Sequence, residues 1–173
     1  MKLRSMERED LKACARLYAR VFAAAPWNEP WDAELALRRL AHFEASSGFL
    51  GMVAEGHDET GEVLGFALGN LEPFCRGTLF YLREMCVGTA WQSRGVGTAL
   101  YRALEARLHG HQAQALYLAT DRGIPAAAFY SGLGFRRSEN MAFYAKRLAG
   151  EGACPRVADD RPSPDPQMGD PTG

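Results

Sequence analysis

The stretch WQSRGVGTAL, residues 91–100, places a basic side chain and two glycines directly before a run with helical hydrophobic spacing. The N-terminus of a helix presents backbone N–H groups that have no acceptor within the helix, and together with the helix dipole they attract an anion. Gly95 and Gly97 allow the backbone to approach a ligand closely, because glycine has no Cβ and adopts positive φ at little cost. Arg94 adds a positive charge and Thr98 a hydroxyl. The turn is therefore predicted to bind a phosphate or a pyrophosphate.

The residues around the two glycines narrow the choice of phosphate compound. The G-K-[ST] ending of a P-loop is missing here, and Leu100 stands where the dinucleotide fingerprint G-x-G-x-x-G has its third glycine. The pattern that fits is Q-x-x-G-x-G, formed by Gln92, Gly95 and Gly97. A module that binds ATP or NAD through this turn is accordingly disfavoured.

Length and composition favour one soluble domain. The chain has 173 residues, 47% of them hydrophobic, and a formal charge of -1, which allows one sizeable core. No stretch approaches 18 uncharged apolar residues, and the N-terminal MKLRSMERED carries charge where a signal peptide has its apolar segment. We therefore expect a cytoplasmic protein with no membrane partner. The four cysteines form no CxxC pair and the four histidines show no ligand spacing, so neither disulfides nor a metal site are expected.

The C-terminal segment differs in composition from the rest of the chain. Residues 150–173 contain five of the nine prolines and five acidic residues, with almost no bulky apolar side chains. Such a composition does not offset the entropy lost on ordering, so this tail is predicted to be disordered. The remaining residues 1–149 form the predicted domain, and their net charge near +2 is too balanced for a nucleic-acid partner.

Changes of hydrophobic period predict the elements that position the glycine-rich turn. Asp10 and Asp32 are plausible N-caps of two successive helices, and a hairpin of two strands follows. The full set is a strand near Leu3, helices after Asp10 and Asp32, strands at 48–55, 61–70 and 78–87, a helix at 97–109, a buried strand at 116–120, a helix at 125–133 and a last strand at 141–148. Hairpin strands followed by a strand-helix-strand unit predict a mixed α/β domain whose parallel part lies in the second half.

Two motifs resemble those of the GNAT superfamily of N-acetyltransferases. One is Q-x-x-G-x-G directly after the strand that ends in EMCV, and the other is AFYSGLGF, residues 128–135, which is similar to the family signature A-x-x-FY-x-x-x-GF. The resemblance covers nearly all of residues 1–148. It implies an α/β GNAT fold with a mixed, mostly antiparallel sheet of about 6–7 strands and about four helices, splayed between the fourth and fifth strands.

The resemblance also implies a cofactor, acetyl-CoA, and a set of residues that bind it. Backbone groups of Met85, Cys86 and Val87 would contact the pantetheine arm and the thioester. Phe129 and Tyr130 would complete the cofactor site, with Tyr130 donating a hydrogen bond or a proton to the sulfur of coenzyme A; aromatic packing of a helix on the sheet is the alternative for Tyr130. The pyrophosphate would bind to the loop residues Gln92, Ser93, Arg94, Gly95, Val96, Gly97 and Thr98.

Glu84 is the candidate general base, acting directly or through water. A carboxylate beside an apolar thioester channel can have its pKa raised toward neutrality. Simple alternation places Leu82 and Glu84 on one face of the strand and Tyr81, Arg83 and Met85 on the other, whereas a bulge would exchange the face that Glu84 occupies. The alternative is an ion pair of Glu84 with Arg83 or another basic residue.

The segment PWNEPW, residues 26–31, lies between the first two predicted helices, a region that forms the acceptor side of many GNAT sites. Trp27, Asn28, Glu29 and Trp31 are the candidate substrate-binding residues, because aromatic walls with nearby carboxylates suit a cationic amine or an aminosugar. The equally supported alternative is that the two tryptophans pack the helices together.

The predicted function is acetyl transfer to the primary amine of a small molecule by direct attack in a ternary complex. An aminoglycoside or another aminosugar is the first expected acceptor, and proteins, peptides and polyamines are alternatives. An acyl-enzyme formed on Cys86 is disfavoured, because no histidine is placed by sequence to activate the thiol. A non-catalytic acyl-CoA sensor is the alternative of another class, and the chain is expected to be a monomer or a homodimer.

Overall fold

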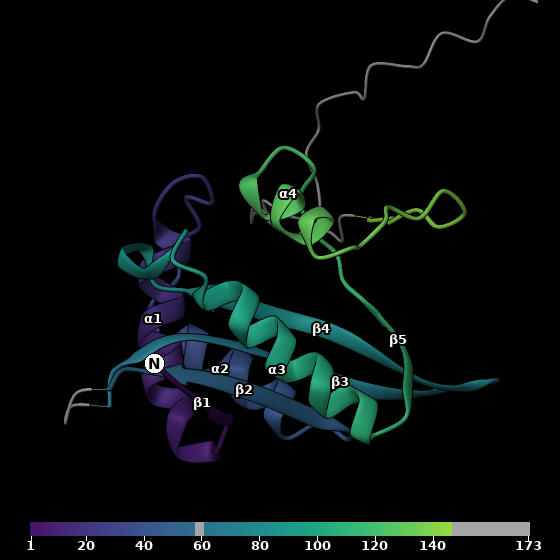
Figure 1. The fold of residues 1–173 in the computed structure, drawn as a ribbon. Helices are drawn as coiled ribbons and strands as arrows, with labels where there is room; N and C mark the ends of the chain where they lie inside the picture. The colour runs from purple at the N-terminus through teal and green to yellow at the C-terminus, as the bar shows by residue number, and fades with distance from the viewer. Residues whose placement is uncertain (58–60, 147–173) are drawn as a thin grey trace, which may run out of the picture.

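The computed structural model describes residues 1–57 and 61–146, which form a five-stranded sheet in the order β1-β2-β3-β4-β5 (Figure 1). The strands are β1 (Lys2–Ser5), β2 (Phe49–Glu55), β3 (Val63–Phe74), β4 (Gly77–Val87) and β5 (Ala113–Tyr117). The helices are α1 (Leu11–Ala23), α2 (Ala33–Glu44), α3 (Val96–Gly110) and α4 (Pro125–Gly132), with short 3-10 turns η1 (Arg8–Asp10) and η2 (Thr89–Trp91). None of the helices in these ranges combines the length and the apolar character needed to cross a membrane.

Two hydrophobic clusters hold the helices on opposite faces of the sheet. Helices α1 and α2 lie behind the sheet in Figure 1 and α3 crosses in front of it. Tyr18 of α1 and Leu40 of α2 are fully buried in the first cluster, and Leu100 and Leu104 of α3 are fully buried in the second. The helical spacing of the apolar residues on α1, α2 and α3 thus gives one buried stripe on each of these helices.

The sheet is mixed and mostly antiparallel, as predicted. Strands β1 to β4 pair antiparallel in sequence order, and β5 pairs parallel with β4. The β4–β5 pairing extends only from Thr78 to Tyr81 of β4, although β4 continues to Val87. Beyond that point β5 leads the chain away toward α4 (Figure 1). The predicted splay between the fourth and fifth strands is therefore confirmed.

Two predicted strands differ from the structure. The strand expected at 116–120 instead spans Ala113–Tyr117 and is partly exposed rather than buried, because β5 is the edge of the described sheet. Residues 141–146 of the expected last strand form no strand, and residues 147–148 lie outside the described part of the chain. Met141, Phe143 and Tyr144 are 78%, 72% and 90% exposed, so this apolar segment is not packed against the edge of the sheet at β5. The described sheet accordingly has five strands instead of six or seven, and the tail predicted at 150–173 also lies outside the described residues.

The two predicted helix caps have different outcomes. Asp32 caps α2, since its Oδ1 accepts a hydrogen bond of 2.7 Å from the N–H of Leu35. Asp10 does not cap α1. Its carboxylate instead binds the guanidinium of Arg4 at 2.6 and 2.8 Å and the N–H of Glu7 at 2.8 Å, which places it on the preceding 3-10 turn. The hydrogen bonds from Arg4 lower the pKa of Asp10, and the same bonds keep this carboxylate from capping the helix.

Candidate active site

Strand β4 carries a β-bulge at Arg83. Strand β3 advances by one residue where β4 advances by two, from Leu82 to Glu84. Leu82 accordingly packs in the cluster on the α3 side, whereas Glu84 contacts Arg39 of α2 on the other side. The prediction from simple alternation, with Leu82 and Glu84 on one face, is wrong, because the extra residue turns the remainder of the strand over.

Gly69 of β3 makes room for this bulge. A Cβ at this position would lie 2.0 Å from the carbonyl oxygen of Tyr81 and 2.7 Å from the ring of Phe80. Both neighbours belong to β4 just before the bulge, and one of them is backbone, which does not yield as a flexible side chain does. A glycine is therefore required where β3 faces the bulge.

Glu84 forms a buried ion pair with Arg39. Only 4% of Glu84 is exposed, and both Nε and Nη2 of Arg39 lie 2.6 Å from its Oε1. The guanidinium lies 5.6 Å from the ring of Trp31 and 5.1 Å from that of Phe43. The sequence had suggested Arg83 or another basic residue as partner, and the structure assigns Arg39. The candidate base is thus a carboxylate whose charge is compensated and whose position is fixed.

A second group of side chains, contributed by β3, β4 and β5, lies beside the Arg39–Glu84 ion pair. The guanidinium of Arg83 lies 3.9 Å from the ring of Tyr81, which stacks on Tyr117 of β5 at 4.6 Å. Glu72 accepts a 3.0 Å hydrogen bond from Nη2 of Arg83 and another from the hydroxyl of Tyr117. Burial first, and then the bond to Glu72, raise the pKa of Tyr117 to about 12. Sequence reasoning gave none of these residues a binding role.

The Q-x-x-G-x-G loop leads into the N-terminus of α3. Gly95 is the N-cap residue at φ 82, a left-handed conformation that glycine adopts without strain, and no side chain caps the helix. The first N–H groups of α3 therefore have neither an intrahelical acceptor nor a side-chain cap. Gln92 donates a 3.0 Å hydrogen bond from its side chain to the carbonyl of Val87, which ties the loop to the end of β4.

The second glycine of the motif serves helix packing. A Cβ at Gly97 would lie 3.2 Å from the ring of Phe129 on α4. Gly97 thus lets α4 approach the first turn of α3, which brings Phe129 to the loop. Ser93, Arg94 and Thr98 complete the loop, with Ser93 and Arg94 exposed and Thr98 half-buried.

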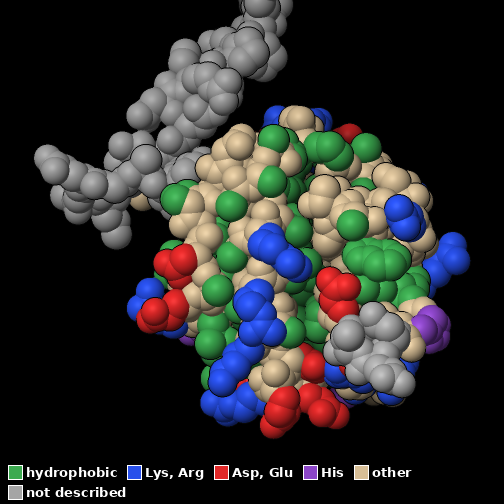
Figure 2. Space-filling view, turned by 90° about the vertical axis from the view of Figure 1, so that its left-hand side faces the viewer, with side chains coloured by type: hydrophobic (Ala, Val, Ile, Leu, Met, Phe, Trp, Pro, Cys, Tyr) green, Lys and Arg blue, Asp and Glu red, His purple; other side chains and the backbone are tan. Residues whose placement is uncertain are grey.

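The end of the molecule that carries this loop also displays basic groups. Figure 2 shows Lys and Arg side chains, with Asp and Glu side chains nearby, among hydrophobic ones on the face where the loop after α1 meets the start of α3. Arg94 belongs to this end, with its guanidinium 5.5 Å from the ring of Trp91. An uncapped helix N-terminus together with positive side chains suits the pyrophosphate of coenzyme A.

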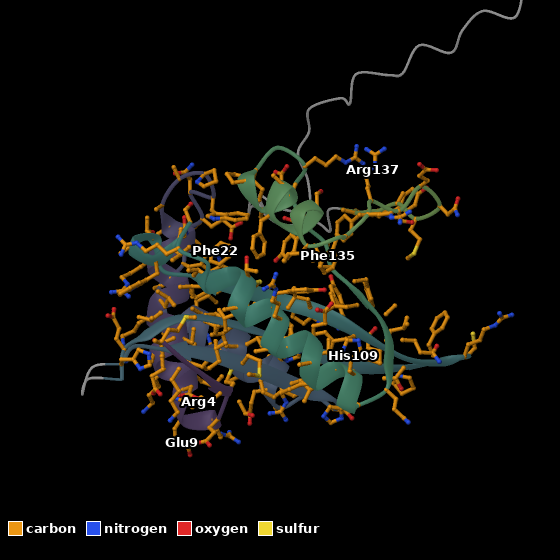
Figure 3. All side chains as sticks on the ribbon, viewed as in Figure 1. Arg4, Glu9, Phe22, His109, Phe135 and Arg137 are labelled. Atoms are coloured by element: carbon orange, nitrogen blue, oxygen red, sulfur yellow. The ribbon has the colours of Figure 1, made fainter. Side chains whose placement is uncertain are left out.

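Tyr130 lies on α4 and packs on the α3 side of the sheet. Its ring contacts those of Phe129 and Phe135 at 5.3 and 5.4 Å, and Phe135 lies between α4 and α3 (Figure 3). Burial first, and then the charge of Glu84, raise the pKa of Tyr130 to about 12. The charge of Glu84 thus reaches Tyr130, although the two side chains lie on different faces of the sheet.

Met85, Cys86 and Val87 follow the last β4 residue that pairs with β5. Among residues 1–57 and 61–146, no strand lies on the β5 side of this segment, so that edge faces the splay. The Cys86 side chain is 3% exposed, and burial followed by the charge of Glu84 raises the pKa of its thiol. A buried thiol that resists ionisation agrees with the packing interpretation of Cys86.

The tryptophans of PWNEPW pack on α1. Trp27 lies 4.9 Å from Phe22, and Trp31 lies edge-on to Tyr18 at 5.1 Å, measured between ring centroids. Because Trp31 also lies beside Arg39 of α2, it links the two helices. These contacts agree with the alternative in which the two tryptophans pack the helices together. They also connect Trp31 to Glu84 through the side chain of Arg39.

The two polar residues of the segment have different surroundings. Glu29 is buried, its Oε2 accepts a 2.6 Å hydrogen bond from Nε1 of Trp31, and its N–H donates to the carbonyl of Phe22 at 2.9 Å. Asn28 is exposed at φ 50, and its side chain reaches back to the carbonyl of Pro26. The structure thus gives Glu29 a structural partner and leaves Asn28 at the surface.

Comparison with known proteins supports the interpretation of this geometry. The family model described as Acetyltransferase (GNAT) family matches residues 9–135. The chain belongs to the GNAT acetyltransferase family. Enzymes of this family take acetyl groups from acetyl-CoA, and the chain is accordingly an acetyltransferase of the GNAT type. No curated protein matches its sequence.

Solved structures share the GNAT fold at low sequence identity. An acetyltransferase of Trypanosoma brucei is 22% identical with a TM-score of 0.62, and the match covers 86% of this chain and 98% of that one. An aminoglycoside acetyltransferase from an uncultured soil metagenomic sample, in complex with trehalose, is 20% identical with a TM-score of 0.65 over 86% and 96% of the two chains. Aminoglycoside N-acetyltransferase AAC(6')-Iy in complex with CoA is 18% identical with a TM-score of 0.65 over 85% and 95%.

Proposed function

We propose that the chain is an acetyl-CoA-dependent N-acetyltransferase that acetylates the primary amine of a small molecule by direct transfer in a ternary complex. The observation that carries this proposal is the splay between β4 and β5. Strand β4 pairs with β5 only as far as Tyr81, and Glu84 lies on the unpaired part that follows. The uncapped N-terminus of α3 lies beyond the end of this unpaired part. Donor and acceptor would meet at the splay from opposite faces of the sheet.

The donor would lie along the α3 side. Residues 92–98 would bind the pyrophosphate through their N–H groups, and the backbone of residues 85–87 would bind the pantetheine arm and polarise the thioester carbonyl. Phe129 would contact the cofactor at the first turn of α3, beside Gly97. The positive side chains of this end of the molecule would add a long-range attraction for the anionic cofactor.

The chemistry needs a neutral amine, a site for the oxyanion and a proton for the departing thiolate. The amine nitrogen attacks the thioester carbon, and the C–S bond breaks as the tetrahedral intermediate collapses. Glu84 accepts the proton of the amine directly or through water, and Tyr130 donates a proton to the sulfur. Because the pKa of Tyr130 is about 12, the phenol stays protonated and keeps this proton available at neutral pH.

The acceptor class is the finer part of the proposal. Aminosugars, including aminoglycosides, are the first class to test, since two of the similar structures are aminoglycoside acetyltransferases and an aminoglycoside-resistance role would follow. Polyamines, peptides and amino acids form the comparison classes. The buried thiols of Cys14 and Cys86 suit a reducing compartment, so we place the enzyme in the cytoplasm.

Initial-rate kinetics with both substrates varied test the proposal. Direct transfer predicts intersecting double-reciprocal lines, whereas an acyl-enzyme on Cys86 predicts parallel lines. The acyl-CoA sensor makes a different prediction: Glu84→Gln and Tyr130→Phe would leave function unchanged, and only disruption of residues 92–98 would abolish it. Loss of turnover in both side-chain variants with retained acetyl-CoA binding supports the enzyme.

A further inference from the structure

We propose that the amine acceptor carries a carboxylate and that Arg83 binds it. This inference rests on the proposed function and names the substrate class of the same site. It differs from the aminoglycoside expectation, because an aminoglycoside is a polycation. The charges on the α2 side of β4, where the acceptor would enter, indicate this substrate class.

The acidic side chains of this region already have donors within the protein. Glu84 is held by Arg39, Glu29 accepts from Trp31, and Glu72 accepts from Arg83 and Tyr117. The carboxylate of Asp32 caps α2. Carboxylates that already accept such hydrogen bonds attract a polycation less strongly than free carboxylates do, because part of their charge is compensated. The acidic residues from which the sequence predicted a cationic acceptor therefore have structural partners within the protein.

Arg83 differs from these acidic residues, because one of its hydrogen-bonding groups lacks a partner among the described residues. Its Nη2 donates to Glu72, but its buried Nε finds no hydrogen-bond acceptor among the described residues. A guanidinium presents its N–H groups as a planar fork that matches a carboxylate with two parallel hydrogen bonds. An N–H group that is buried without an acceptor is destabilising, and a ligand carboxylate would supply the missing acceptor.

The surroundings hold the Arg83 guanidinium in place. It lies 3.9 Å from the ring of Tyr81 and 5.8 Å from that of Phe43, and the side chain is 31% exposed. Phe43 also lies beside Arg39, so one aromatic ring contacts two guanidinium groups. Each guanidinium is also paired with a carboxylate, Arg39 with Glu84 and Arg83 with Glu72, so both are held in place next to the candidate base.

A hollow of about 210 Å³ gives the ligand room beside Arg83. Phe43, Asn70, Glu72 and Arg83 contribute to its lining. Its wall is rigid at Asn70, whose side-chain amide donates to three carbonyls at the end of α2, at 3.2 to 3.4 Å. Arg83 compensates the charge of Glu72 and the Tyr117 hydroxyl donates to its other carboxylate oxygen, so Glu72 repels an anion less than a free carboxylate would.

The bulge in β4 places the site for the carboxylate of the acceptor next to the base that would deprotonate its amine. Arg83 is the extra residue in β4 and Glu84 is the next residue, so the carboxylate site and the base lie one residue apart. An amine separated from a carboxylate by a short carbon chain, as in an amino acid, has the dimensions to reach both. We infer that one backbone irregularity positions both groups.

Matched pairs of acceptors test the inference on the full chain at saturating acetyl-CoA. We would measure thiol release with free amino acids, with the corresponding amino-acid amides, and with an aminoglycoside. The expected preference for the acid over its amide is about 10- to 100-fold in kcat/KM. Arg83→Gln should abolish this preference by raising KM for the acid, with little change in kcat and no change for the amide.

Two further variants keep the test decisive. Arg83→Lys keeps the charge but loses the planar fork, so its KM for the acid should be intermediate. Arg102→Gln, an exposed arginine on α3, is the matched control and should behave as wild type. If Arg83→Gln fails to fold, as judged by circular dichroism, Arg83→Lys carries the test.

Other outcomes would overturn the inference in distinguishable ways. Equal turnover of acid and amide, or aminoglycoside turnover whose KM does not respond to Arg83→Gln, would remove the carboxylate site and leave the proposed function standing. Binding of acetyl-CoA with no turnover of any amine would remove both.

Discussion

Arg39 and Glu84, 45 residues apart in the sequence, meet as a buried ion pair in which two guanidinium nitrogens lie 2.6 Å from one carboxylate oxygen. The pair joins α2 to the bulged part of β4, so it fixes the candidate base relative to the helix that borders the acceptor side. Arg39 is a positioning residue in this account, because it touches the base and not the reacting atoms.

Replacing Arg39 should destabilise the fold. Arg39→Met leaves the buried Glu84 carboxylate without its partner, which we expect to cost about 2 to 4 kcal/mol of unfolding free energy. Urea denaturation measures the loss. The double variant Arg39→Met with Glu84→Leu should recover most of it, since no uncompensated charge remains. Losses that simply add in the double variant would show that the two side chains do not interact.

Removing the hydroxyl of Tyr130 should slow the chemical step. Tyr130→Phe is expected to lower kcat about 10- to 100-fold while leaving KM for acetyl-CoA nearly unchanged. The raised pKa of about 12 means that the proton donor is present below that pH and is lost only as the pH rises through it. Wild-type kcat should therefore show no decline due to Tyr130 between pH 8 and 10. A decline in that range that disappears in Tyr130→Phe would show that the pKa of Tyr130 is not raised, and an unchanged kcat in Tyr130→Phe would refute the role itself.

The bulge should depend on Gly69. Gly69→Ala places a methyl group 2.0 Å from the carbonyl oxygen of Tyr81, so we expect a loss of more than about 3 kcal/mol or failure to fold. The matched control is Gly110→Ala, where a Cβ would meet open space, and this variant should be neutral or slightly stabilising. Thermal unfolding compares the two. A stable Gly69→Ala protein would mean that β3 and β4 pair differently from the structure described.

The left-handed conformation of Gly95 should matter for the donor. Gly95→Ala meets no steric obstacle but must adopt φ 82, which we expect to cost about 1 to 2 kcal/mol. If the strain is relieved by a change in the loop, KM for acetyl-CoA should rise about 10-fold with little effect on the acceptor KM. Calorimetric titration of acetyl-CoA provides the check, and unchanged affinity would place the pyrophosphate elsewhere.

Local sequence signals predicted the backbone geometry of the glycine-rich loop well. Gly95 and Gly97 stand where a turn leads into a helix, and the structure gives one a positive φ and the other a close contact with Phe129. The cap at Asp32 was likewise predictable, because it depends on residues only three positions apart. These features need no knowledge of distant parts of the chain.

The acceptor side depends on contacts that sequence patterns do not encode. The bulge at Arg83 arises from pairing with β3, and alternation along β4 alone gave the wrong face for Glu84. The partner of Glu84 is 45 residues away. One signal was available: Arg39 lies three residues after Ala36 and four before Phe43, on the inner stripe of α2, where an arginine needs a partner. Asp10 likewise binds a residue outside the helix that it was predicted to cap, namely Arg4.

The most direct test of the central claim is release of the coenzyme A thiol from acetyl-CoA when a primary amine is added to the full chain. The panel would contain aminosugars, polyamines, amino acids and short peptides, and mass spectrometry would identify the acetylated product. The account predicts thiol release with at least one class and an equal amount of N-acetylated amine. Saturable binding of acetyl-CoA without thiol release across the whole panel would contradict it.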